Sequence, residues 1–259
     1  MTTYKSTQHT VAKRMVIKLG GSMLVELNAD FFATFEQFQE AGYEVIVVHG
    51  GGPAINKELA KNHVASTVLN GIRVTSEDAI KIVQSTIIGQ VNPALVHQLN
   101  RAGIEAIGLS GNDGKLLTCS YLDESVYGFV GDIQHVNVEL IEKVLAAGLV
   151  PVISCIGSTD DGTPLNINAD TVASRLALAL GTESLLLVTD TAGITIDNNV
   201  QQIASPSAIS AWIASGEIHG GMLPKVEAAL ASLQAGVPSV QIVGRQLRGT
   251  LITKEEALV

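Results

Sequence analysis

The chain has 259 residues, of which 46% are hydrophobic and 16% are charged. This composition is typical of a compact folded protein and excludes a disordered or fibrous chain. Because 16 basic residues stand against 25 acidic ones, the formal net charge is -9, and we expect no nucleic-acid partner.

The cysteines, the lengths of the apolar runs and the N-terminal residues indicate in which cellular compartment the protein is expected. Cys119 and Cys155 are the two cysteines, and neither has the spacing of a zinc site or of a disulfide framework, so we expect a cytoplasmic protein without a protein-bound metal. No run of about 18 apolar residues occurs, so no membrane span is expected. Residues 1–14 are polar and unlike a signal peptide. We expect them to be a tail, either disordered or an artefact, since Met15 could itself be a start.

Short apolar runs alternate with glycine turns and segments of helical period, which is the pattern of a parallel α/β sheet. Buried strands are predicted at residues 16–19, 45–48, 104–109, 150–156 and 185–189. Helices are predicted at residues 28–41, 53–62, 78–101, 169–180 and 225–235. Gly89 or Pro93 should bend the third helix, and residues 115–137 are predicted to form an antiparallel insertion of hairpins.

These elements predict a three-layer αβα sandwich with a largely parallel central sheet. No linker rich in proline, serine or charge separates the two halves of the chain. A boundary between two lobes near residue 173 would therefore be a hinge beside a common cleft rather than a flexible tether.

Two glycine clusters follow predicted strands, at the edge where open α/β sheets bind ligands. Lys18 precedes Gly20 and Gly21, and a lysine in an apolar strand is costly to bury without an anion. Gly50 to Gly52 precede a proline, and their N–H groups at a helix start can bind an anion. The alternatives are a solvated edge lysine and a tight turn. Neither cluster matches a P-loop or a dinucleotide-binding fingerprint.

Three polar residues alternate in LNINAD: Asn166, Asn168 and Asp170 should share one face, and helix capping would explain only one of them. Arg73, in NGIRVT, is either a bidentate carboxylate clamp or an ordinary surface arginine. LNINAD is expected to lie at the carboxyl end of a strand, like the glycine clusters.

Lys225 lies in GGMLPK at a helix start, where the helix dipole disfavours a cation unless a phosphate is present. The alternative is a solvated lysine. Asp190 follows a predicted strand and is expected to bind a nucleotide or to cap a turn. His49 is expected to be structural rather than a base. Because no nucleophilic triad or HExxH pattern occurs, the predicted chemistry is electrostatic.

Eight motifs in order, VIKLGGS, VVHGGGP, NGIRVT, LSGNDG, GFVGDI, LNINAD, VTDTAGI and GGMLPKV, resemble those of the amino-acid kinase family. The resemblance runs from about Met15 to the C-terminus. NGIRVT together with LNINAD favours a member that acts on N-acetyl-L-glutamate over members that act on carbamate, uridylate or aspartate.

The resemblance implies that ATP, with Mg²⁺, phosphorylates the side-chain carboxylate of N-acetyl-L-glutamate in the second step of arginine biosynthesis. An ionised carboxylate needs no general base, so the enzyme has only to position the reactants and to neutralise charge on the phosphoryl oxygens. In this interpretation Lys18 and Lys225 flank the transferring group, and Asp170 holds both lysines.

The resemblance also implies roles for the remaining residues and for the two lobes. The glycines Gly20, Gly21, Gly50, Gly51 and Gly52 would donate N–H groups to phosphoryl and substrate oxygens. Arg73, Asn166 and Asn168 would bind the substrate in a lobe of residues 15–173. The nucleotide would lie in a lobe of residues 174–259, bordered by Asp190, Gly193, Glu217, Ile218, His219, Gly220 and Gly221.

Family members that arginine inhibits carry a longer N-terminal helix, so the resemblance implies a homodimer that is insensitive to arginine. Two other interpretations stay open at this point. The chain could be a related kinase for aminoadipate, glutamate or a carrier-bound amino acid, or a sensor that binds a ligand on the same fold without catalysis.

Overall fold

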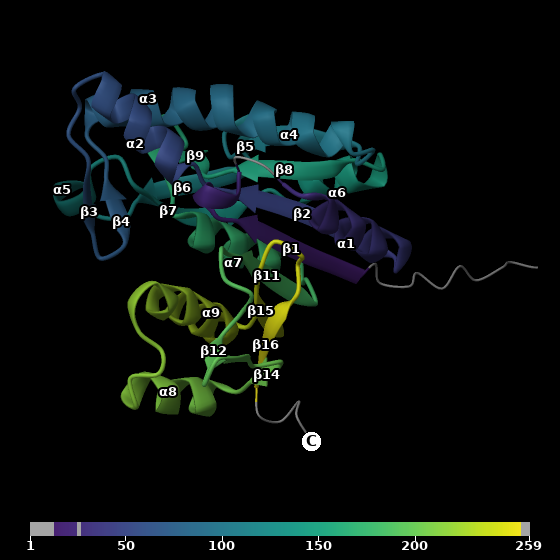
Figure 1. Cartoon of the computed structure of the whole chain (residues 1–259). Helices are drawn as coiled ribbons and strands as arrows, with labels where there is room; N and C mark the ends of the chain where they lie inside the picture. Colours follow the sequence, from purple (N-terminus) through teal and green to yellow (C-terminus); the bar gives the residue numbers. More distant parts are fainter. Residues whose placement is uncertain (1–12, 25–26, 255–259) are drawn as a thin grey trace, which may run out of the picture.

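The computed structural model describes residues 13–24 and 27–254, and an eight-stranded sheet runs through the middle of this part of the chain (Figure 1). In spatial order its strands are β14 (Ile203–Ala204), β16 (Gly249–Thr253), β15 (Ser239–Val243), β11 (Ser184–Val188), β1 (Lys13–Leu19), β2 (Tyr43–His49), β8 (Val150–Ser154) and β5 (Ala106–Ser110). Every neighbouring pair is parallel except β15 and β16. The predicted α/β class with a largely parallel sheet is confirmed.

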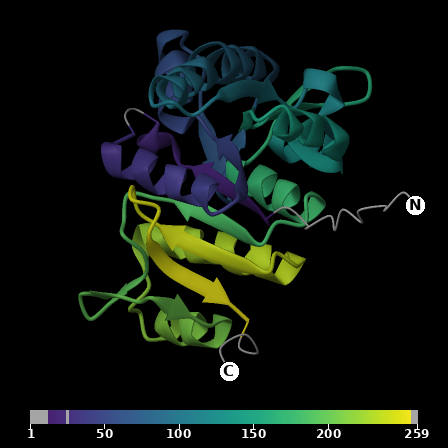
Figure 2. The same ribbon diagram turned by 90° about the vertical axis from the view of Figure 1, so that its right-hand side faces the viewer.

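Helices cover both faces of this sheet, because its strands carry apolar side chains on both sides. The helices are α1 (Ala29–Glu40), α2 (Gly52–Lys61), α3 (Glu77–Thr86), α4 (Asn92–Arg101), α5 (Glu124–Tyr127), α6 (Val138–Ala146), α7 (Ala169–Ala179), α8 (Pro206–Ala214) and α9 (Leu223–Ala235). Helices α1 and α4 pack on one face, and α6, α7 and α9 pack on the other. Figure 2 shows the yellow C-terminal strands in the lower half of the molecule and the purple N-terminal part above them.

Side chains of β1 alternate between the two cores. Val16 belongs to the core beneath α7 and α9, whereas Ile17 and Leu19 belong to the core beneath α1 and α4. Lys18 therefore faces the same side of the sheet as Val16. This alternation brings its ammonium group to the start of α7.

The long helix predicted at residues 78–101 is interrupted by the π-helical turn η2 (Ile87–Val91), which joins α3 to α4. This turn contains Gly89, and Pro93 follows it in the first turn of α4, so the helix changes its hydrogen-bond pattern at the place where a bend was predicted. Such turns carry one extra residue in the helix and are frequent at functional sites.

A smaller four-stranded sheet, in the order β10, β9, β6, β7, lies beside the main one. Its strands are β6 (Leu117–Tyr121), β7 (Gly131–Val136), β9 (Ile156–Ser158) and β10 (Pro164–Asn166). The antiparallel pairing of β6 with β7 confirms the predicted insertion at residues 115–137, although the short helix α5 was not predicted there. The separate hairpins are β3 (Thr67–Leu69) with β4 (Ile72–Val74), and β12 (Thr195–Ile196) with β13 (Asn199–Val200).

Two details of the structure differ from the sequence prediction. Strand β1 begins at Lys13, so the boundary of the tail at residue 14 is wrong; residues 1–12 lie outside the described residues. Arg14 is fixed by an ion pair with Glu44, 2.8 Å from Nε to Oε2, on the adjacent strand. Strands β14 to β16 were not predicted. In the described part of the chain, no helix has the length and apolar character needed to span a membrane.

Candidate active site

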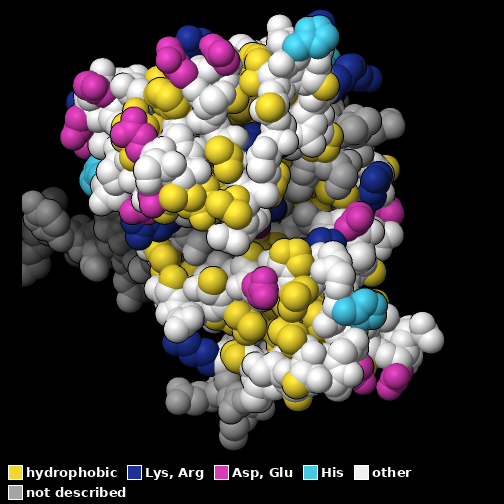
Figure 3. All heavy atoms as spheres, turned by 90° about the vertical axis from the view of Figure 1, so that its left-hand side faces the viewer, with side chains coloured by type: hydrophobic (Ala, Val, Ile, Leu, Met, Phe, Trp, Pro, Cys, Tyr) yellow, Lys and Arg dark blue, Asp and Glu magenta, His cyan; other side chains and the backbone are white. Residues whose placement is uncertain are grey.

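Two cavities lie side by side at the carboxyl ends of β1, β2 and β11, and Lys18 and Gly20 line both. The first pocket, about 270 Å³, is lined mainly by the N-terminal two thirds of the chain, and the second, about 250 Å³, mainly by residues after 186. In Figure 3 a hollow lies between the upper and lower halves of the molecule, with hydrophobic side chains on both rims. The location of the site at this edge of the sheet is as predicted.

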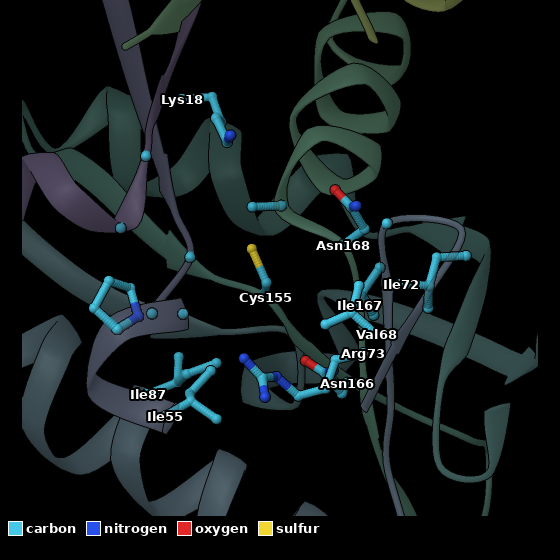
Figure 4. Close-up of a pocket in the computed structure, with 18 of the residues that line it drawn as sticks. Lys18, Ile55, Val68, Ile72, Arg73, Ile87, Cys155, Asn166, Ile167 and Asn168 are labelled. Atoms are coloured by element: carbon cyan, nitrogen blue, oxygen red, sulfur yellow. The ribbon is translucent and has the colours of Figure 1, made fainter. Parts of the chain in front are cut away.

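Lys18 forms the wall between the two pockets. Its side chain is 16% exposed, and its Nζ lies 2.9 Å from Oδ1 of Asp170. The carboxylate offsets part of the cost of holding an ammonium group in a strand that is otherwise apolar. Figure 4 shows Lys18 and Arg73 on opposite sides of the first pocket, with Cys155 between them.

The glycine clusters line the first pocket from two directions. Gly20 and Gly21 follow β1, and Gly50 to Gly52 join β2 to the start of α2. A Cβ atom on Gly21 would lie 2.6 Å from Pro53 Cδ, so the two loops touch where only glycine fits. Since Gly51 is the N-cap of α2, free N–H groups and the positive end of the helix dipole face this pocket.

Arg73 projects from strand β4 and lines the far end of the first pocket. Its guanidinium donates hydrogen bonds to Ser66 Oγ and, at 2.6 Å, to Asn56 Oδ1. Both partners are neutral, and Arg73 forms no ion pair with any described residue. Burial lowers the pKa of the Arg73 guanidinium, which nevertheless stays charged at neutral pH. A charged group with uncompensated charge fits a carboxylate ligand.

LNINAD divides its polar residues between the two pockets. Asn166 ends β10, and Asn168 is the N-cap of α7, where its Oδ1 accepts a hydrogen bond from the Asp170 N–H at 2.8 Å. Asn166 and Asn168 line the first pocket, and Asp170 lines the second. Capping therefore explains Asn168 alone, as predicted. The strand before this segment belongs to the small sheet rather than to the main one.

Lys225 and Asp190 face each other in the second pocket. Lys225 Nζ donates to Asp190 Oδ1 at 2.7 Å, and this contact, together with a hydrogen bond from Thr189 Oγ1, lowers the pKa of Asp190 to about 2. Asp170 was predicted to hold both lysines, but in this structure it pairs with Lys18, and Lys225 pairs with Asp190. The reason is that Asp190 lies two residues after the end of β11, within reach of Lys225 in the first turn of α9.

Some residues predicted to border a nucleotide do not line either of the two pockets. Gly193 packs against Thr250, and the buried Ile218 donates its N–H to Trp212 O at 3.0 Å. The side chains of Glu217 and His219 bond within their own turn, to Ser215 and to the Gly216 carbonyl. Of this predicted segment, Gly221 lines the second pocket and Gly220 does not.

The apolar lining of both pockets was not predicted, because the pattern of the sequence does not distinguish such residues from core residues. In the second pocket these side chains are Leu187, Val188, Pro224 and Ile242. In the first pocket they are Leu19, Pro53, Ile55, Val68, Ile72, Ile87, Val130, Cys155, Ile167 and Ala169. His49, predicted to be structural, is fully buried behind the glycine loop and does not line either pocket.

The arrangement can hold two anionic groups on either side of one ammonium group. Glycine N–H groups and Lys18 meet at the junction of the pockets, while Arg73 and Lys225 supply positive charge farther out in each. Donors fixed in a partly apolar site stabilise charge more strongly than water does. Among the side chains that line the two pockets, none is a histidine or a serine that could act as base or nucleophile.

Comparison with known proteins points to one family. The family model "Amino acid kinase family" matches residues 13–244. An acetylglutamate kinase of Halalkalibacterium halodurans is 43% identical over 229 residues, covering 88% of each chain, and one of Geobacillus stearothermophilus is 40% identical over 253 residues, covering 95% of this chain and 98% of that one.

Solved structures agree with this match. The crystal structure of smu.665 from Streptococcus mutans UA159 has a TM-score of 0.84 at 36% identity and covers 93% of this chain and 99% of that one. A carbamate kinase from Giardia lamblia bound to AMP-PNP has a TM-score of 0.64 at 18% identity, covers 94% and 99% of the two chains, and shares the fold. The chain belongs to the amino acid kinase family.

Proposed function

We propose that this chain transfers the γ-phosphoryl group of ATP to the side-chain carboxylate of N-acetyl-L-glutamate, forming an acyl phosphate and ADP in the second step of arginine biosynthesis. The observation that carries this proposal is that two pockets share Lys18 and Gly20 as a common wall. A phosphoryl donor and an acceptor can then lie on two sides of one ammonium group. The two acetylglutamate kinases, at 43% and 40% identity, support the choice of acceptor.

The reaction needs positioning and charge neutralisation rather than proton transfer. The acceptor carboxylate is already ionised at neutral pH, so it can attack without a general base. Lys18 and Lys225 reduce the charge on the phosphoryl oxygens as they move from donor to acceptor. Asp170 orients Lys18 through the 2.9 Å ion pair, and Asp190 orients Lys225.

The first pocket is the acceptor site in this proposal. Arg73 binds the carboxylate of the acceptor that does not react, since a guanidinium without an ion-pair partner is suited to bidentate carboxylate binding. Asn166 and Asn168 supply amide groups at the same pocket. N–H groups of the glycines at 50–52 meet the reacting end of the acceptor and the incoming phosphoryl group.

The second pocket is the nucleotide site. Its apolar floor suits a base and a ribose, and Lys225, Asp190 and Gly221 stand at its rim. Lys18 and the N–H groups of Gly20 and Gly21 face the terminal phosphates. The predicted roles of Gly193 and of residues 217–220 beside the nucleotide stay predictions.

Mg²⁺ accompanies ATP in phosphoryl transfer, and when bound it would supply positive charge that offsets the charge of the phosphates. Asp170 and Asp190 are the carboxylates of the second pocket, and the described part of the chain holds no cluster of three or more His, Cys, Asp or Glu side chains suited to a metal. These donors fit an ion that is held chiefly by phosphates and water, with one or two carboxylates at most.

We extend the proposal to the lobes and to the oligomer. The first pocket is lined by residues 18–169, and the second adds residues 187–242, which supports an acceptor lobe of residues 15–173 and a nucleotide lobe of residues 174–259. The chain is also proposed to form a homodimer. One surface that could take part is the edge strand β5, where the side chain of Ile107 is 36% exposed. Light scattering should give twice the mass of the chain, and the mass of one chain would refute the dimer.

An assay of ADP release over a panel of acidic acceptors tests the activity. We expect N-acetyl-L-glutamate to give a kcat/KM at least about tenfold above those of glutamate, aminoadipate, aspartate and carbamate, because each of these leaves pocket groups unpaired. Hydroxylamine should trap the acyl phosphate as a hydroxamate. ADP release with another acceptor as the best substrate, or no ADP release with any, would refute the proposal and favour a related kinase or a sensor.

A further inference from the structure

His49, the last residue of β2, is fully buried directly behind the glycine loop. Its ring makes two hydrogen bonds. Nδ1 lies 2.8 Å from the carbonyl oxygen of Gly50, and Nε2 lies 2.9 Å from Nδ2 of Asn92. Asn92 Nδ2 also donates to Val152 O at 2.9 Å, so both of its amide hydrogens have an acceptor.

These contacts determine the tautomer of the ring. A carbonyl oxygen only accepts hydrogen bonds, so Nδ1 of His49 must carry the proton that bonds to Gly50. Nε2 is then the acceptor for the amide of Asn92. Burial favours this neutral ring and lowers the pKa of His49 to about 4. Every polar atom of the imidazole is therefore used in a fixed orientation.

The first bond of His49 determines the orientation of one peptide unit of the loop. The peptide between Gly50 and Gly51 is planar and trans, so its N–H points away from its carbonyl. Because the carbonyl is held toward the buried ring, the N–H of Gly51 points to the other side, where Gly50 to Gly52 line the first pocket. This N–H has no acceptor among the described residues.

A second contact holds the same glycine from the helix above it. A Cβ atom on Gly51 would lie 3.1 Å from Ile87 Cγ1 and 3.6 Å from Val91 Cγ2, at the two ends of the π-helical turn η2. Asn92 is the next residue after this turn. The turn therefore packs against Gly51, and the residue that follows it fixes the ring that holds Gly50.

We propose that His49, oriented by Asn92, is a positioning residue that holds the Gly50–Gly51 peptide so that the Gly51 N–H donates to an oxygen of the transferring phosphoryl group. This role rests on the proposed function, because it assigns the donor to phosphoryl transfer. His49 does not touch the substrates and acts only through the peptide. If the histidine merely filled the core, any side chain of similar volume that left the protein equally stable would leave kcat unchanged.

Two substitutions separate the two bonds of His49. In His49→Asn the side-chain amide nitrogen can take the place of Nδ1 and still donate to Gly50 O, while the bond to Asn92 is lost. In His49→Gln the amide group lies near the place of Nε2 and keeps the contact with Asn92, while the bond to Gly50 is lost. Each variant thus loses one hydrogen bond of His49, and only His49→Gln loses the bond to Gly50.

The kinetic result expected is a selective loss in His49→Gln. Its kcat should fall by about tenfold or more, as when one transition-state donor is misplaced, with the KM of both substrates changed by less than about threefold. His49→Asn should keep kcat within about threefold of wild type. Equal loss of kcat in the two variants, in step with their melting temperatures, would overturn the proposal.

Nuclear magnetic resonance gives a readout that does not depend on turnover. Long-range ¹H–¹⁵N spectra of the wild-type protein at pH 7 should show His49 as the neutral Nδ1–H tautomer, and the Nε2–H tautomer would overturn the proposal. With inorganic phosphate as the probe, the Gly51 amide signal should shift in wild type and His49→Asn and not in His49→Gln. Wild-type inactivity toward every acceptor would refute the proposed function, whereas the same phosphate response in both variants would refute the positioning role.

Discussion

Lys18 in the middle of the sheet and Asp170 in the first turn of α7 form an ion pair, with Nζ 2.9 Å from Oδ1. The backbone that carries this carboxylate is held in place, since the N-cap Asn168 accepts a hydrogen bond from the Asp170 N–H. A helix start thus sets the position of a carboxylate, and the carboxylate sets the position of an ammonium group between two pockets. The other lysine of the site, Lys225, has its own carboxylate in Asp190.

Lys18→Ala and Lys225→Ala should each lower kcat by at least about a hundredfold with a modest change in KM, because transition-state charge loses a fixed donor. The measurement is steady-state ADP release with N-acetyl-L-glutamate. Lys81→Ala is the matched control, since Lys81 pairs with Glu77 on the surface of α3 and lines neither pocket. Near-normal turnover in both site variants would remove these lysines from the mechanism.

Asp170→Asn and Asp190→Asn should differ, because each carboxylate holds a different lysine. Asp170→Asn leaves Lys18 at the junction of the pockets without a counter-charge, and we expect kcat to fall by about tenfold or more. The Asp190 side chain is 68% exposed, so water screens its ion pair with Lys225, and loss of the carboxylate should change kcat by less than about fivefold. A larger loss of kcat in Asp190→Asn than in Asp170→Asn would contradict the assignment.

Arg73→Lys should raise the KM for N-acetyl-L-glutamate by about tenfold or more and leave the KM for ATP unchanged. A lysine keeps the charge but cannot form the two parallel hydrogen bonds of a guanidinium with a carboxylate. Initial rates with one substrate varied at a time would measure both constants. An equal rise in the two KM values would mean that Arg73 supports the whole site rather than the acceptor.

The buried His49 should make the folded protein sensitive to acid. Its pKa is lowered from 6.5 to about 4 in the folded state, so the unfolded chain takes up a proton first as the pH falls. The stability due to the neutral ring is complete above about pH 6.5 and is lost progressively down to about pH 4. Over this range the loss amounts to about 3 kcal/mol in the free energy of unfolding.

Denaturant unfolding of wild type and His49→Asn between pH 7 and pH 4 would measure this effect. Carboxylates titrate in the same range in both proteins, so the difference between the two curves isolates the histidine. We expect the advantage of wild type over the variant to shrink as the pH falls. A constant difference across the range would show that the ring is not held neutral.

The sequence predicted the fold where one physical signal dominated. Apolar runs identified the central parallel strands, and glycines marked the ends of helices; Gly236, for example, ends α9 in the left-handed conformation. Strands β15 and β16 were missed because they follow one another after the last predicted helix and pair antiparallel, unlike the repeated βα plan. The π-helical turn was predicted only as a bend, since nothing in the local pattern distinguishes it from a kink.

For the site, the types of residue revealed the individual charged side chains but not how they pair. Lys18, Arg73 and Lys225 stood out because a charge in an apolar or helix-start context needs a partner. Which carboxylate meets which lysine depends on how α7 and α9 lie against the sheet, and the sequence does not specify that geometry. Asp190 was therefore expected to bind nucleotide or cap a turn, and its ion pair with Lys225 was missed.

The common wall of the two pockets has a thermodynamic consequence. Because Lys18 borders both cavities, a ligand in either one changes the electrostatic field felt by a ligand in the other. Two ligands linked in this way show heterotropic coupling, and the coupling is reciprocal: the factor by which one alters the affinity of the other is the same in both directions. Each occupant of the site is thus also an effector of its neighbour.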